Sequence, residues 1–466
     1  MKTIIIGGVA AGSSTAAKLS RLDKDAEIVI YEERGFISYS ACNMPYYIGD
    51  LFDDETSLMP RDPQYFQEHY NTKVLTEHRV ISVDPDQKKV LVKNLQTGET
   101  FEDFYDNLVL STGASSAFPP IEGLEKENVY SLRVVEDMKE LKAELECCMP
   151  PGSTAIVIGS GFIGLEMVEN FKNLGYHVKL LVRSVVSNLS PEMSIYMETH
   201  LENQGIELIR DASATKITDN GVILGDGREI TGDFVFVATG AKPNVELAKE
   251  MGVEIGVTGA IKTDPQMRTN IPNVYAGGDC TETTSVIDGS PMYIPLGSTA
   301  NKMGRVIADD IVGNKVAFPG IAGSSIFKLF DMTIGSTGFS EQRAKDEGYN
   351  TLVFYHASRS HYKNHGGEPM LVKAVVNRDN LQLLGVEIVG FEGVLARLDT
   401  YATYITFHGT IDTLEFLDTA YAPPYSTVRD VVLYTGMIGM SLYEKGIFEP
   451  KNRRNEHFLE YVKNRK

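Results

Sequence analysis

Two stretches of the chain repeat the same order of apolar residues and glycines. In each, a short apolar run leads into a glycine-rich turn, an amphipathic segment follows, and a second apolar run comes after it. The first copy spans residues 3–31 and the second spans residues 155–181. A short apolar run predicts a buried strand, and apolar residues at helical spacing predict a helix. Each copy therefore predicts a parallel strand–helix–strand unit.

The first glycine-rich turn follows the apolar run Thr3–Ile6 and precedes a helix expected from about Ser13 to Leu22. Glycines at the two ends of such a turn allow a tight bend and close packing of helix against strand. The helix N-terminus then faces a pyrophosphate, and a carboxylate after the second strand, here Glu32, binds a ribose diol. Val9 replaces the middle glycine, so this motif taken alone also fits a turn without a ligand. The residues that would hold the dinucleotide are Gly7, Gly8, Val9, Ala10, Ala11, Gly12, Glu32, Glu33 and Arg34.

The second copy contains the complete glycine motif. Its three glycines and the candidate contact to a nicotinamide ring are Gly159, Gly161, Gly164 and Glu166. After the next expected strand, Val182 stands where an NAD-binding protein carries an acidic residue, and Arg183 follows it. A missing carboxylate together with an arginine favours the 2′-phosphate of NADPH. If Arg183 is only a solvated residue at a strand end, NADH remains the alternative.

Two further apolar runs, Leu108–Leu110 and Val235–Val237, each lead to a Thr-Gly-Ala tract. Each tract would close one nucleotide-binding unit and mark a crossing between domains. Later, a short strand ends in Gly-Gly-Asp, and a helix is expected from about Ile294 to Val312. Glycines let a ligand approach the backbone, and a helix N-terminus stabilises negative charge. These tracts add Ser111, Thr112, Gly113, Gly240, Gly278, Asp279, Pro295, Leu296, Gly297 and Ala300 to the cofactor-binding candidates.

The last third of the chain alternates differently, with apolar strands followed by helical segments. Strands are expected over Ser325–Phe330, Leu352–His356, Met370–Asn377 and Leu383–Val389, and helices near Leu395–Phe407 and Ile411–Phe416. The stretch after Glu449 is rich in Lys and Arg and is expected to be a short basic amphipathic helix or a frayed tail, solvated on the surface. The fold class is therefore α/β, with two Rossmann-like dinucleotide-binding domains and a C-terminal α+β domain.

The expected domains follow from these boundaries. The first is discontinuous, with residues 1–112 and 241–318, and encloses the second, residues 113–240. The third spans residues 319–448, and a basic tail spans residues 449–466.

Composition narrows the function classes. The chain has 466 residues and a net charge of −19, from 44 basic and 63 acidic side chains, which argues against nucleic acid and anionic membranes as main partners. No apolar run reaches about 18 residues, so no membrane span is expected. The four cysteines predict neither a disulfide framework nor a metal site, and a reducing cytoplasm fits best. The vicinal pair Cys147-Cys148 could be redox-active, but a surface or packing role is favoured.

Cys42 is the strongest candidate for chemistry. It lies in a small polar turn, and Asn43 and Pro45 after it suit the start of a helix. The positive end of a helix dipole would stabilise its thiolate. The next cysteine in the sequence is Cys147, so Cys42 is expected to work without a neighbouring thiol.

With these residues in view, the chain resembles the flavoprotein pyridine nucleotide-disulfide oxidoreductases from Met1 to about Met440. Within them it is similar to the group with a single redox cysteine, whose mark Ser-Phe-x-x-Cys reads Ser38-Tyr39-Ser40-Ala41-Cys42 here. Two-cysteine reductases carry a second cysteine where this chain has Tyr47. Oxidases and peroxidases of the group usually carry a histidine where this chain has Ala10. In lacking this histidine, the chain is similar to the coenzyme A (CoA) disulfide reductases.

The resemblance implies FAD in the first unit, NADPH or NADH in the second, and reduction of a CoA disulfide, CoA persulfide or polysulfide through Cys42. It also implies a homodimer in which the partner subunit completes the active site. The catalytic candidates that accompany Cys42 are Tyr421, Tyr362 and Tyr425, and the CoA-binding candidates are Ser14, Lys18, Arg21, Ser38 and Asn43.

Two alternatives stay open. One is an NAD(P)H oxidase that reduces O2 through a sulfenic acid on Cys42, against which Ala10 counts. The other is a redox-sensing flavoprotein, which only the basic tail and Cys147-Cys148 support.

Overall fold

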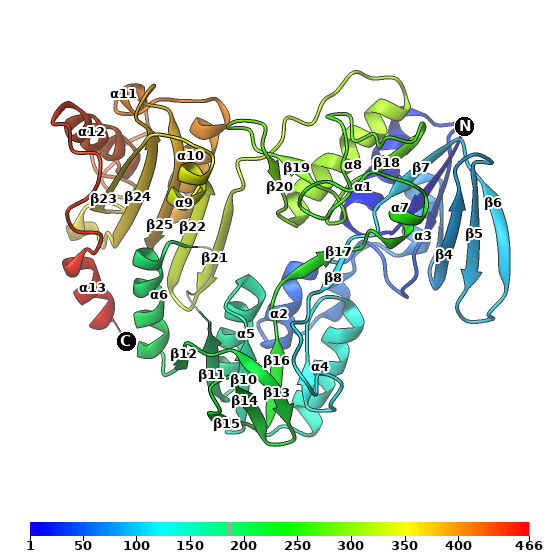
Figure 1. Ribbon diagram of the computed structural model, residues 1–466, viewed down its shortest axis with the longest axis horizontal. Coiled ribbons are helices and arrows are strands. Elements are labelled where there is room, and N and C mark those ends of the chain that lie inside the picture. The colour runs from blue at the N-terminus through cyan, green and yellow to red at the C-terminus, as the bar shows by residue number, and fades with distance from the viewer. Residues whose placement is uncertain (184–188, 466) are drawn as a thin grey trace.

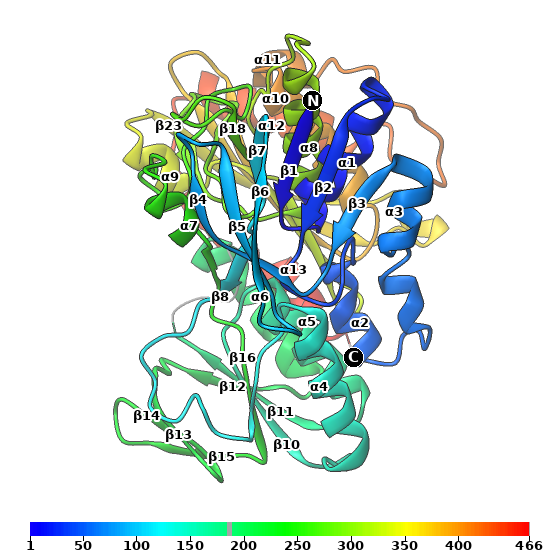
Figure 2. The same ribbon diagram turned by 90° about the vertical axis from the view of Figure 1, so that its right-hand side faces the viewer.

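The structure is a computed structural model that describes residues 1–183 and 189–465. It has three lobes (Figure 1), and Figure 2 shows the N-terminal lobe above the second lobe and in front of the third. Each lobe is built around one five-stranded sheet. None of the described helices is both long enough and apolar enough to span a membrane.

The N-terminal lobe contains a parallel sheet in the order β18-β7-β1-β2-β3. Its strands are β1 (Lys2–Ile6), β2 (Glu27–Tyr31), β3 (Thr72–Leu75), β7 (Asn107–Leu110) and β18 (Val274–Ala276). Its helices are α1 (Ala10–Leu22), α3 (Pro63–Tyr70), α7 (Glu246–Glu250) and α8 (Gly297–Ile311). Two small antiparallel sheets complete it: β4 (His78–Asp84), β5 (Lys89–Asn94) and β6 (Thr100–Phe104), and the pair β19 (Thr283–Thr284) and β20 (Pro291–Met292).

The second lobe repeats this plan in the order β12-β11-β10-β16-β9. Its strands are β9 (Val129–Tyr130), β10 (Thr154–Ile158), β11 (His177–Val182), β12 (Glu207–Arg210) and β16 (Phe234–Val237). Its helices are α4 (Val135–Cys147), α5 (Phe162–Asn173) and α6 (Pro191–Asn203), and β13 (Ala214–Thr218), β14 (Gly221–Leu224) and β15 (Glu229–Thr231) form a small sheet beside it. Both expected strand–helix–strand units are thus confirmed.

The chain crosses between these two lobes at β8 (Ala114–Ser116) and β17 (Ala241–Pro243), which pair in antiparallel fashion. These strands begin at the alanines of the two Thr-Gly-Ala tracts. The two tracts therefore meet in space, although more than a hundred residues separate them in the sequence.

The third lobe contains an antiparallel sheet in the order β21-β22-β25-β24-β23. Its strands are β21 (Ser325–Leu329), β22 (Met332–Gly338), β23 (Thr351–Arg359), β24 (Pro369–Asn377) and β25 (Leu383–Gly390). Its helices are α9 (Glu341–Asp346), α10 (Val394–Thr406), α11 (Ile411–Leu414) and α12 (Val431–Glu444). The expected α/β fold class with a C-terminal α+β lobe is confirmed, and β22 and α12 are additions to the expected elements.

The expectation of a solvated C-terminal tail is wrong. The segment does form an amphipathic helix, α13 (Glu456–Lys463), but Phe458, Leu459 and Val462 are buried against α6. Full burial of an apolar side chain of this size stabilises a fold by about 1.5–3 kcal/mol. Figure 1 shows α13 beside α6, between the second and third lobes. The tail is therefore part of the core that joins these lobes.

Candidate active site

Cys42 lies at the junction of the first two lobes. It is the middle residue of a 3₁₀ turn, Ala41–Asn43, that runs directly into the short helix α2 (Met44–Ile48). Met44 and Ile48 are buried in the same apolar cluster as residues of the second sheet. Helix α2 packs against α4 and α5 of the second lobe, as both views show. The thiol is exposed at this junction, so it can meet a molecule that sits between the two lobes.

The expected stabilisation of the Cys42 thiolate is not found. Although part of the residue is exposed, the protein atoms around its sulfur desolvate the thiol and raise its pKa. The negative charges of Glu166 and Asp279 raise it further, while Arg133 lowers it. Helix α2 has only five residues and Cys42 precedes it, so its dipole contributes little. The protein alone thus keeps Cys42 as a thiol, and its activation needs positive charge or an acceptor from a bound molecule.

The first glycine-rich turn has the geometry of a dinucleotide cradle. Gly7 has a φ of +100°, and a Cβ there would lie 2.2 Å from the carbonyl oxygen of Ser111. A Cβ on Gly12 would lie 2.0 Å from the carbonyl oxygen of Gly7. Helix α1 begins at Ala10, earlier than expected, and no side chain caps its N-terminus. Free backbone N–H groups at such an end bind phosphate, so this turn fits the pyrophosphate of a dinucleotide.

Glu32 lies where a ribose diol is expected. It is buried at the end of β2 and accepts hydrogen bonds from the backbone N–H groups of Gly8 (2.8 Å) and Arg34 (3.0 Å). Burial raises the pKa of its carboxyl group, and those two hydrogen bonds oppose the rise. Glu33 instead pairs with Arg79 on the surface, at 2.9 Å. Glu32 is therefore the residue of this segment that is held in place for a ligand.

The remaining candidates of the first lobe surround the same turn. The Ser111 hydroxyl donates to the carbonyls of Ile6 (2.9 Å) and Gly7 (2.8 Å), which fixes the turn to β7. Gly278 packs against Ala11, with a hypothetical Cβ 3.1 Å from the Ala11 Cβ. Helix α8 begins at Gly297, after Pro295 and Leu296, and no side chain caps it; Ala300 is buried in its first turn. Thr112 bonds Asn244, and Gly113 and Gly240 have positive φ angles at the interlobe crossing.

Asp279 is engaged in an ion pair that the sequence did not reveal. Its carboxylate lies 2.6 Å from the guanidinium of Arg133, which also donates to the carbonyl of Ala114 at 2.9 Å. Both side chains are partly buried. A carboxylate has several acceptor positions, so Asp279 keeps room for a hydroxyl donor from a ligand.

The second glycine-rich turn repeats the cradle. Gly159 has a φ of +113°, and a Cβ on Gly164 would lie 2.1 Å from the carbonyl oxygen of Gly159. Helix α5 follows with Gly161 as its N-cap residue and no side-chain cap. The end of β11 carries buried Val182 and exposed Arg183. Both turns thus fit a dinucleotide, but only the first has a carboxylate at the ribose position.

Glu166 links the second cradle to the Cys42 segment. Its carboxyl group lies 3.2 Å from the hydroxyl of Tyr46, which belongs to α2. Burial raises the pKa of Glu166 to about 7, although the hydrogen bond from Tyr46 lowers it. Tyr46 was not a candidate from the sequence, because its partner comes from the other lobe. The pair makes Glu166 a group that can hold or release a proton near neutral pH.

A cavity of about 320 Å³ opens beside the first turn. Its walls include Ser14, Arg21 and Ser38, three of the expected CoA-binding residues, and also Arg61 and Arg305, which the sequence analysis missed. The Ser14 hydroxyl accepts a hydrogen bond from Asn301 at 2.6 Å. Three arginines in one cavity suit a ligand with several phosphates.

Two of the CoA-binding candidates lie elsewhere. The ammonium group of Lys18 forms an ion pair with the buried carboxylate of Asp309, which counts against Lys18 as a phosphate ligand. Asn43 lines a second cavity of about 460 Å³, together with Tyr46 and Phe52.

The candidate tyrosines all belong to the third lobe. Tyr362 lies beside Tyr421 and raises the pKa of the Tyr421 hydroxyl. Both are partly exposed, and Tyr425 is 77% exposed. Helices α11 and α12, which flank the segment of Tyr421 and Tyr425, lie far from α2 in Figure 1. The structure thus brings two tyrosines together but does not bring them to Cys42 of the same chain.

The vicinal cysteines lie on the surface, as expected, but they are bonded to each other, which was not expected. Cys147 and Cys148 form a disulfide at the exposed C-terminal end of α4. The carboxylate of Glu144 lies close enough to both sulfur atoms for the three groups to bind a metal ion together. The two sulfurs are, however, bonded to each other. Adjacency in the sequence alone does not establish a bond between two thiols, so the disulfide could not be predicted.

Comparison with known proteins places these features in one group. The family model "Pyridine nucleotide-disulphide oxidoreductase" matches residues 1–304, and the dimerisation-domain model of that family matches residues 324–431. An NAD(P)H sulfur oxidoreductase (CoA-dependent) from Pyrococcus furiosus is 36% identical over 93% of this chain and 97% of its own length. A coenzyme A disulfide reductase from Staphylococcus haemolyticus is 31% identical over 94% of this chain and 98% of its own.

Solved structures agree with this grouping. An NAD-dependent persulfide reductase from A. fulgidus superimposes with a TM-score of 0.91 at 36% identity, covering 97% of this chain and 86% of that one. The similarity thus extends over all three lobes.

Proposed function

The chain belongs to the pyridine nucleotide-disulphide oxidoreductase family, and we propose that it is an FAD-dependent NAD(P)H oxidoreductase that reduces a CoA disulfide, CoA persulfide or polysulfide through Cys42. The observation that carries the proposal is the position of Cys42, exposed where the two dinucleotide cradles meet. The other free cysteine of the described chain, Cys280, is buried, so Cys42 has to find its sulfur partner in the substrate.

We assign FAD to the first cradle and NAD(P)H to the second. The two uncapped helices α1 and α8, together with Glu32, support FAD in the first lobe. The exposed Arg183 after Val182 supports NADPH in the second. When bound, the flavin supplies a two-electron relay from the reduced nicotinamide to sulfur.

Cys42 acts as the nucleophile. Its thiolate attacks one sulfur of the acceptor, a bond forms between Cys42 and that sulfur, and the substrate S–S bond breaks. The leaving thiolate takes up a proton, and Cys42 is left in a mixed disulfide. Two electrons from NAD(P)H then break the mixed disulfide, so that NAD(P)H, one proton and one disulfide give NAD(P)+ and two thiols.

The proton for the leaving thiolate is assigned to a second copy of the chain. Tyr421 and Tyr362 lie beside each other on the third lobe, so one hydroxyl can supply a proton that the other gives up. The tyrosine pair lies far from Cys42 of its own chain. In a homodimer the pair could instead reach Cys42 of the partner subunit, which would explain where the tyrosines and the cysteine lie. The matching dimerisation-domain model supports this arrangement.

The arginine-lined cavity supports CoA as the carrier of the acceptor sulfur. Arg21, Arg61 and Arg305 would bind the phosphates, and Ser14 and Ser38 would position the rest of the ligand. The proposed domains are an FAD-binding domain (residues 1–112 and 241–318), an NAD(P)-binding domain (113–240) and a dimerisation domain (319–448).

Anaerobic steady-state turnover with one enzyme preparation tests the proposal. CoA disulfide, CoA persulfide and polysulfide are offered in turn, each with NADH and with NADPH, and O2 is the separate fourth acceptor. We expect saturable turnover with at least one sulfur acceptor and slow turnover with O2, because Ala10 provides no imidazole near the cysteine. Turnover with O2 alone that equals the sulfur rates would establish the oxidase alternative instead.

A further inference from the structure

The C-terminal segment, residues 449–465, contacts both the second and the third lobe. Phe458, Leu459 and Val462 pack on α6, and the rings of Phe458 and Tyr196 meet edge to face at 5.2 Å. The amide of Asn203, at the end of α6, donates to the carbonyls of Val462 (2.6 Å) and Arg465 (3.1 Å). Helix α6 is thus covered along its length by the end of the chain.

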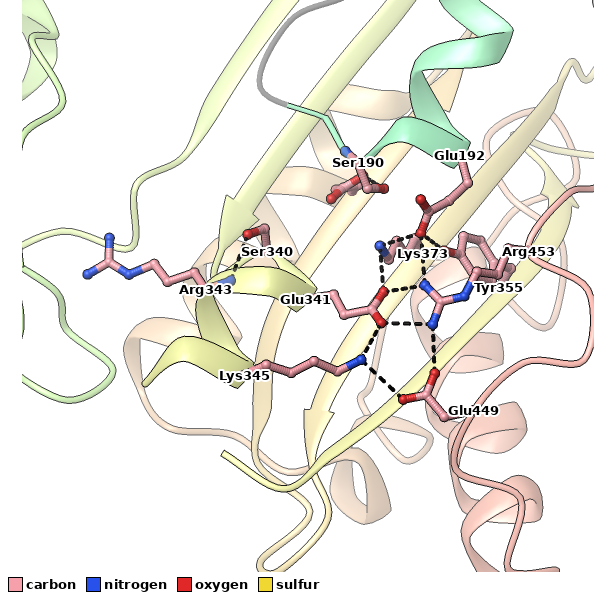
Figure 3. A network of polar contacts seen from close by, with 11 residues as sticks. Ser190, Glu192, Ser340, Glu341, Arg343, Lys345, Tyr355, Lys373, Glu449 and Arg453 are labelled. Atoms are coloured by element: carbon pink, nitrogen blue, oxygen red, sulfur yellow. Dashed lines mark hydrogen bonds and ion pairs between the residues drawn. The ribbon is translucent and has the colours of Figure 1, made fainter. Parts of the chain in front are cut away.

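A network of charges joins the same segment to the first turn of α6 (Figure 3). Arg453 lies 2.7 Å and 2.8 Å from the two carboxylate oxygens of Glu341 and 3.2 Å from Glu192, the second residue of α6. Lys373, which is 1% exposed, contacts the same two carboxylates at 3.0 Å and 2.8 Å. The hydroxyl of Tyr355 donates to Glu192 as well. The tail, the third lobe and α6 therefore share one partly buried set of ion pairs.

A second contact fixes the end of the tail to the third lobe. Arg465 pairs with Asp331 at 2.5 Å and with Glu368 at 3.1 Å, and its guanidinium lies 4.1 Å from the centre of the Phe391 ring. Arg453 and Arg465 thus hold the segment on either side of α13.

Helix α6 matters because of where it begins. It follows β11, whose carboxyl end carries Val182 and Arg183, and in an open parallel sheet ligands bind outside the carboxyl ends of the strands. The first turn of α6 lies at this edge, and Ser190 just before it bonds Glu387 of β25 through its N–H (3.1 Å) and its hydroxyl (2.7 Å). The ion pairs and hydrogen bonds therefore hold α6 at its N-terminal end, which lies on the side of the second cradle.

We propose that the C-terminal segment is a positioning element for the pyridine nucleotide, with Arg453 as its main positioning residue. By fixing the first turn of α6 to the third lobe, it holds the carboxyl edge of the second sheet in the geometry that binds the adenosine end of NAD(P)H. The proposal rests on the proposed function, because it needs NAD(P)H in the second cradle. It assigns a role to a segment that lies beyond both matched family models.

This role predicts a selective effect. Helix α13 packs on α6 and β24, whereas the arginine-lined cavity is built from α1, α3 and α8. Loosening the tail should therefore weaken NAD(P)H binding and leave the binding of the sulfur acceptor unchanged. A merely structural role would lower thermal stability without this distinction.

The test compares Arg453→Met with Arg454→Met in the full-length holoenzyme. Arg454 is the matched control, since it is the neighbouring arginine and pairs only at 3.4 Å with the exposed Glu456. For Arg453→Met we expect the KM for NAD(P)H and the dissociation constant from equilibrium titration to rise about fivefold or more. The KM for the acceptor and kcat should stay within about twofold, and Arg453→Lys should recover part of the loss, because lysine keeps the charge without the paired geometry.

A wild-type-like KM for NAD(P)H in Arg453→Met would overturn the proposal, as would equal rises in the KM for NAD(P)H and for the acceptor. Should Arg453→Met not fold, Arg465→Met carries the same expectation, because it breaks the contact on the other side of α13. Failure of the wild-type enzyme to saturate with either NADH or NADPH would instead overturn the proposed function itself, and this inference with it.

Discussion

The two dinucleotide cradles share one backbone plan but are closed in different ways. The first is closed by its own lobe: the Thr15 hydroxyl of α1 donates to the carbonyl of Gly304 in α8 at 3.0 Å, and a Cβ on Gly304 would lie 2.3 Å from the Ala11 carbonyl oxygen. Its ribose carboxylate, Glu32, is buried and held by two backbone N–H groups. The contacts that hold this cradle thus come from the N-terminal lobe itself.

The second cradle is more open at its strand end, and its helices are held in place by other parts of the chain. On α5, the ring of Phe162 meets Phe327 of β21 at 5.2 Å, and Glu169 accepts a hydrogen bond from the Phe330 N–H at 2.7 Å. Helix α6 is held by the C-terminal segment. Arg183, which follows strand β11 of this cradle, is exposed. The difference suits the two proposed ligands: a cofactor that stays bound needs an enclosed cradle, and a reductant that leaves at every turnover needs an open one.

The largest effect should come from the residue between the cradles. Cys42→Ser removes the nucleophile, so sulfur reduction should fall by at least about 10³-fold while both cradles keep their ligands. Acceptor-dependent NAD(P)H oxidation measures the loss, and the flavin absorbance of the purified protein checks cofactor retention. Cys148→Ser is the control and should retain activity. Wild-type activity in Cys42→Ser would contradict the assignment of the nucleophile.

A matched pair of glycines separates the cradles. Gly12→Ala and Gly164→Ala each place a methyl group about 2 Å from a carbonyl oxygen of the preceding turn. We expect Gly12→Ala to purify without its flavin, and Gly164→Ala to keep the flavin but to require at least about tenfold more NAD(P)H. Flavin content and KM are the two readouts. The comparison fails if Gly164→Ala loses flavin or Gly12→Ala impairs only NAD(P)H use.

Arg183 tests which nucleotide the open cradle prefers. Arg183→Met removes the positive charge assigned to the 2′-phosphate, so the KM for NADPH should rise about tenfold and the KM for NADH should not change. The two KM values are measured with the same acceptor. Equal effects on both nucleotides, or none, would mean that Arg183 is a solvated residue at a strand end.

A smaller effect is expected from the negative charge of Glu166, which acts on the pKa of Cys42. With a pKa of about 7, raised by burial, Glu166 is neutral below neutral pH and negative above it, and its negative charge raises the pKa of Cys42. Glu166→Gln should therefore lower the pKa of Cys42. The pH dependence of Cys42 alkylation measures this shift in flavin-free protein, with Glu169→Gln as the control. An unchanged or raised Cys42 pKa would contradict the interpretation.

The carboxyl group of Glu166 also makes the stability of the fold depend on pH. Burial makes the folded protein hold the Glu166 proton more tightly than the unfolded chain, whose pKa lies near 4.5. Glu166 therefore destabilises the fold as pH rises from about 4.5 to about 7. Thermal unfolding of wild type and Glu166→Gln across this range should show the two converging at the acid end.

The sequence predicted the elements whose signal is local. Strand β2 ends where its apolar run ends, and both glycine-rich turns are explained by carbonyl contacts that only glycine permits. It missed β22, because Gly335, Ser336 and Thr337 interrupt the apolar pattern and the strand is buried by its neighbours β21 and β25. It missed α12 because this helix is apolar on all sides and lacks a polar face.

The errors at the site arise from contacts between distant residues. The apolar positions of α13 were visible, but the surface that receives them lies on α6. Lys18 looked free for a phosphate, yet its partner Asp309 comes from α8. A local helix dipole suggested a thiolate at Cys42, whereas desolvation by the surrounding protein opposes it, together with Glu166 from the second lobe and Asp279. In each case the role of a side chain depends on a partner from an element that is distant in the sequence.

Trapping the substrate sulfur on Cys42 tests directly whether this residue is the nucleophile. Enzyme reduced anaerobically with one equivalent of NAD(P)H is mixed with CoA disulfide, quenched in acid, digested and analysed by mass spectrometry. We expect a CoA mixed disulfide on the peptide that contains Cys42, and we expect it to disappear when further NAD(P)H is added before the quench. A CoA adduct confined to Cys147 or Cys148, or turnover with no adduct on Cys42 at any time, would contradict this expectation.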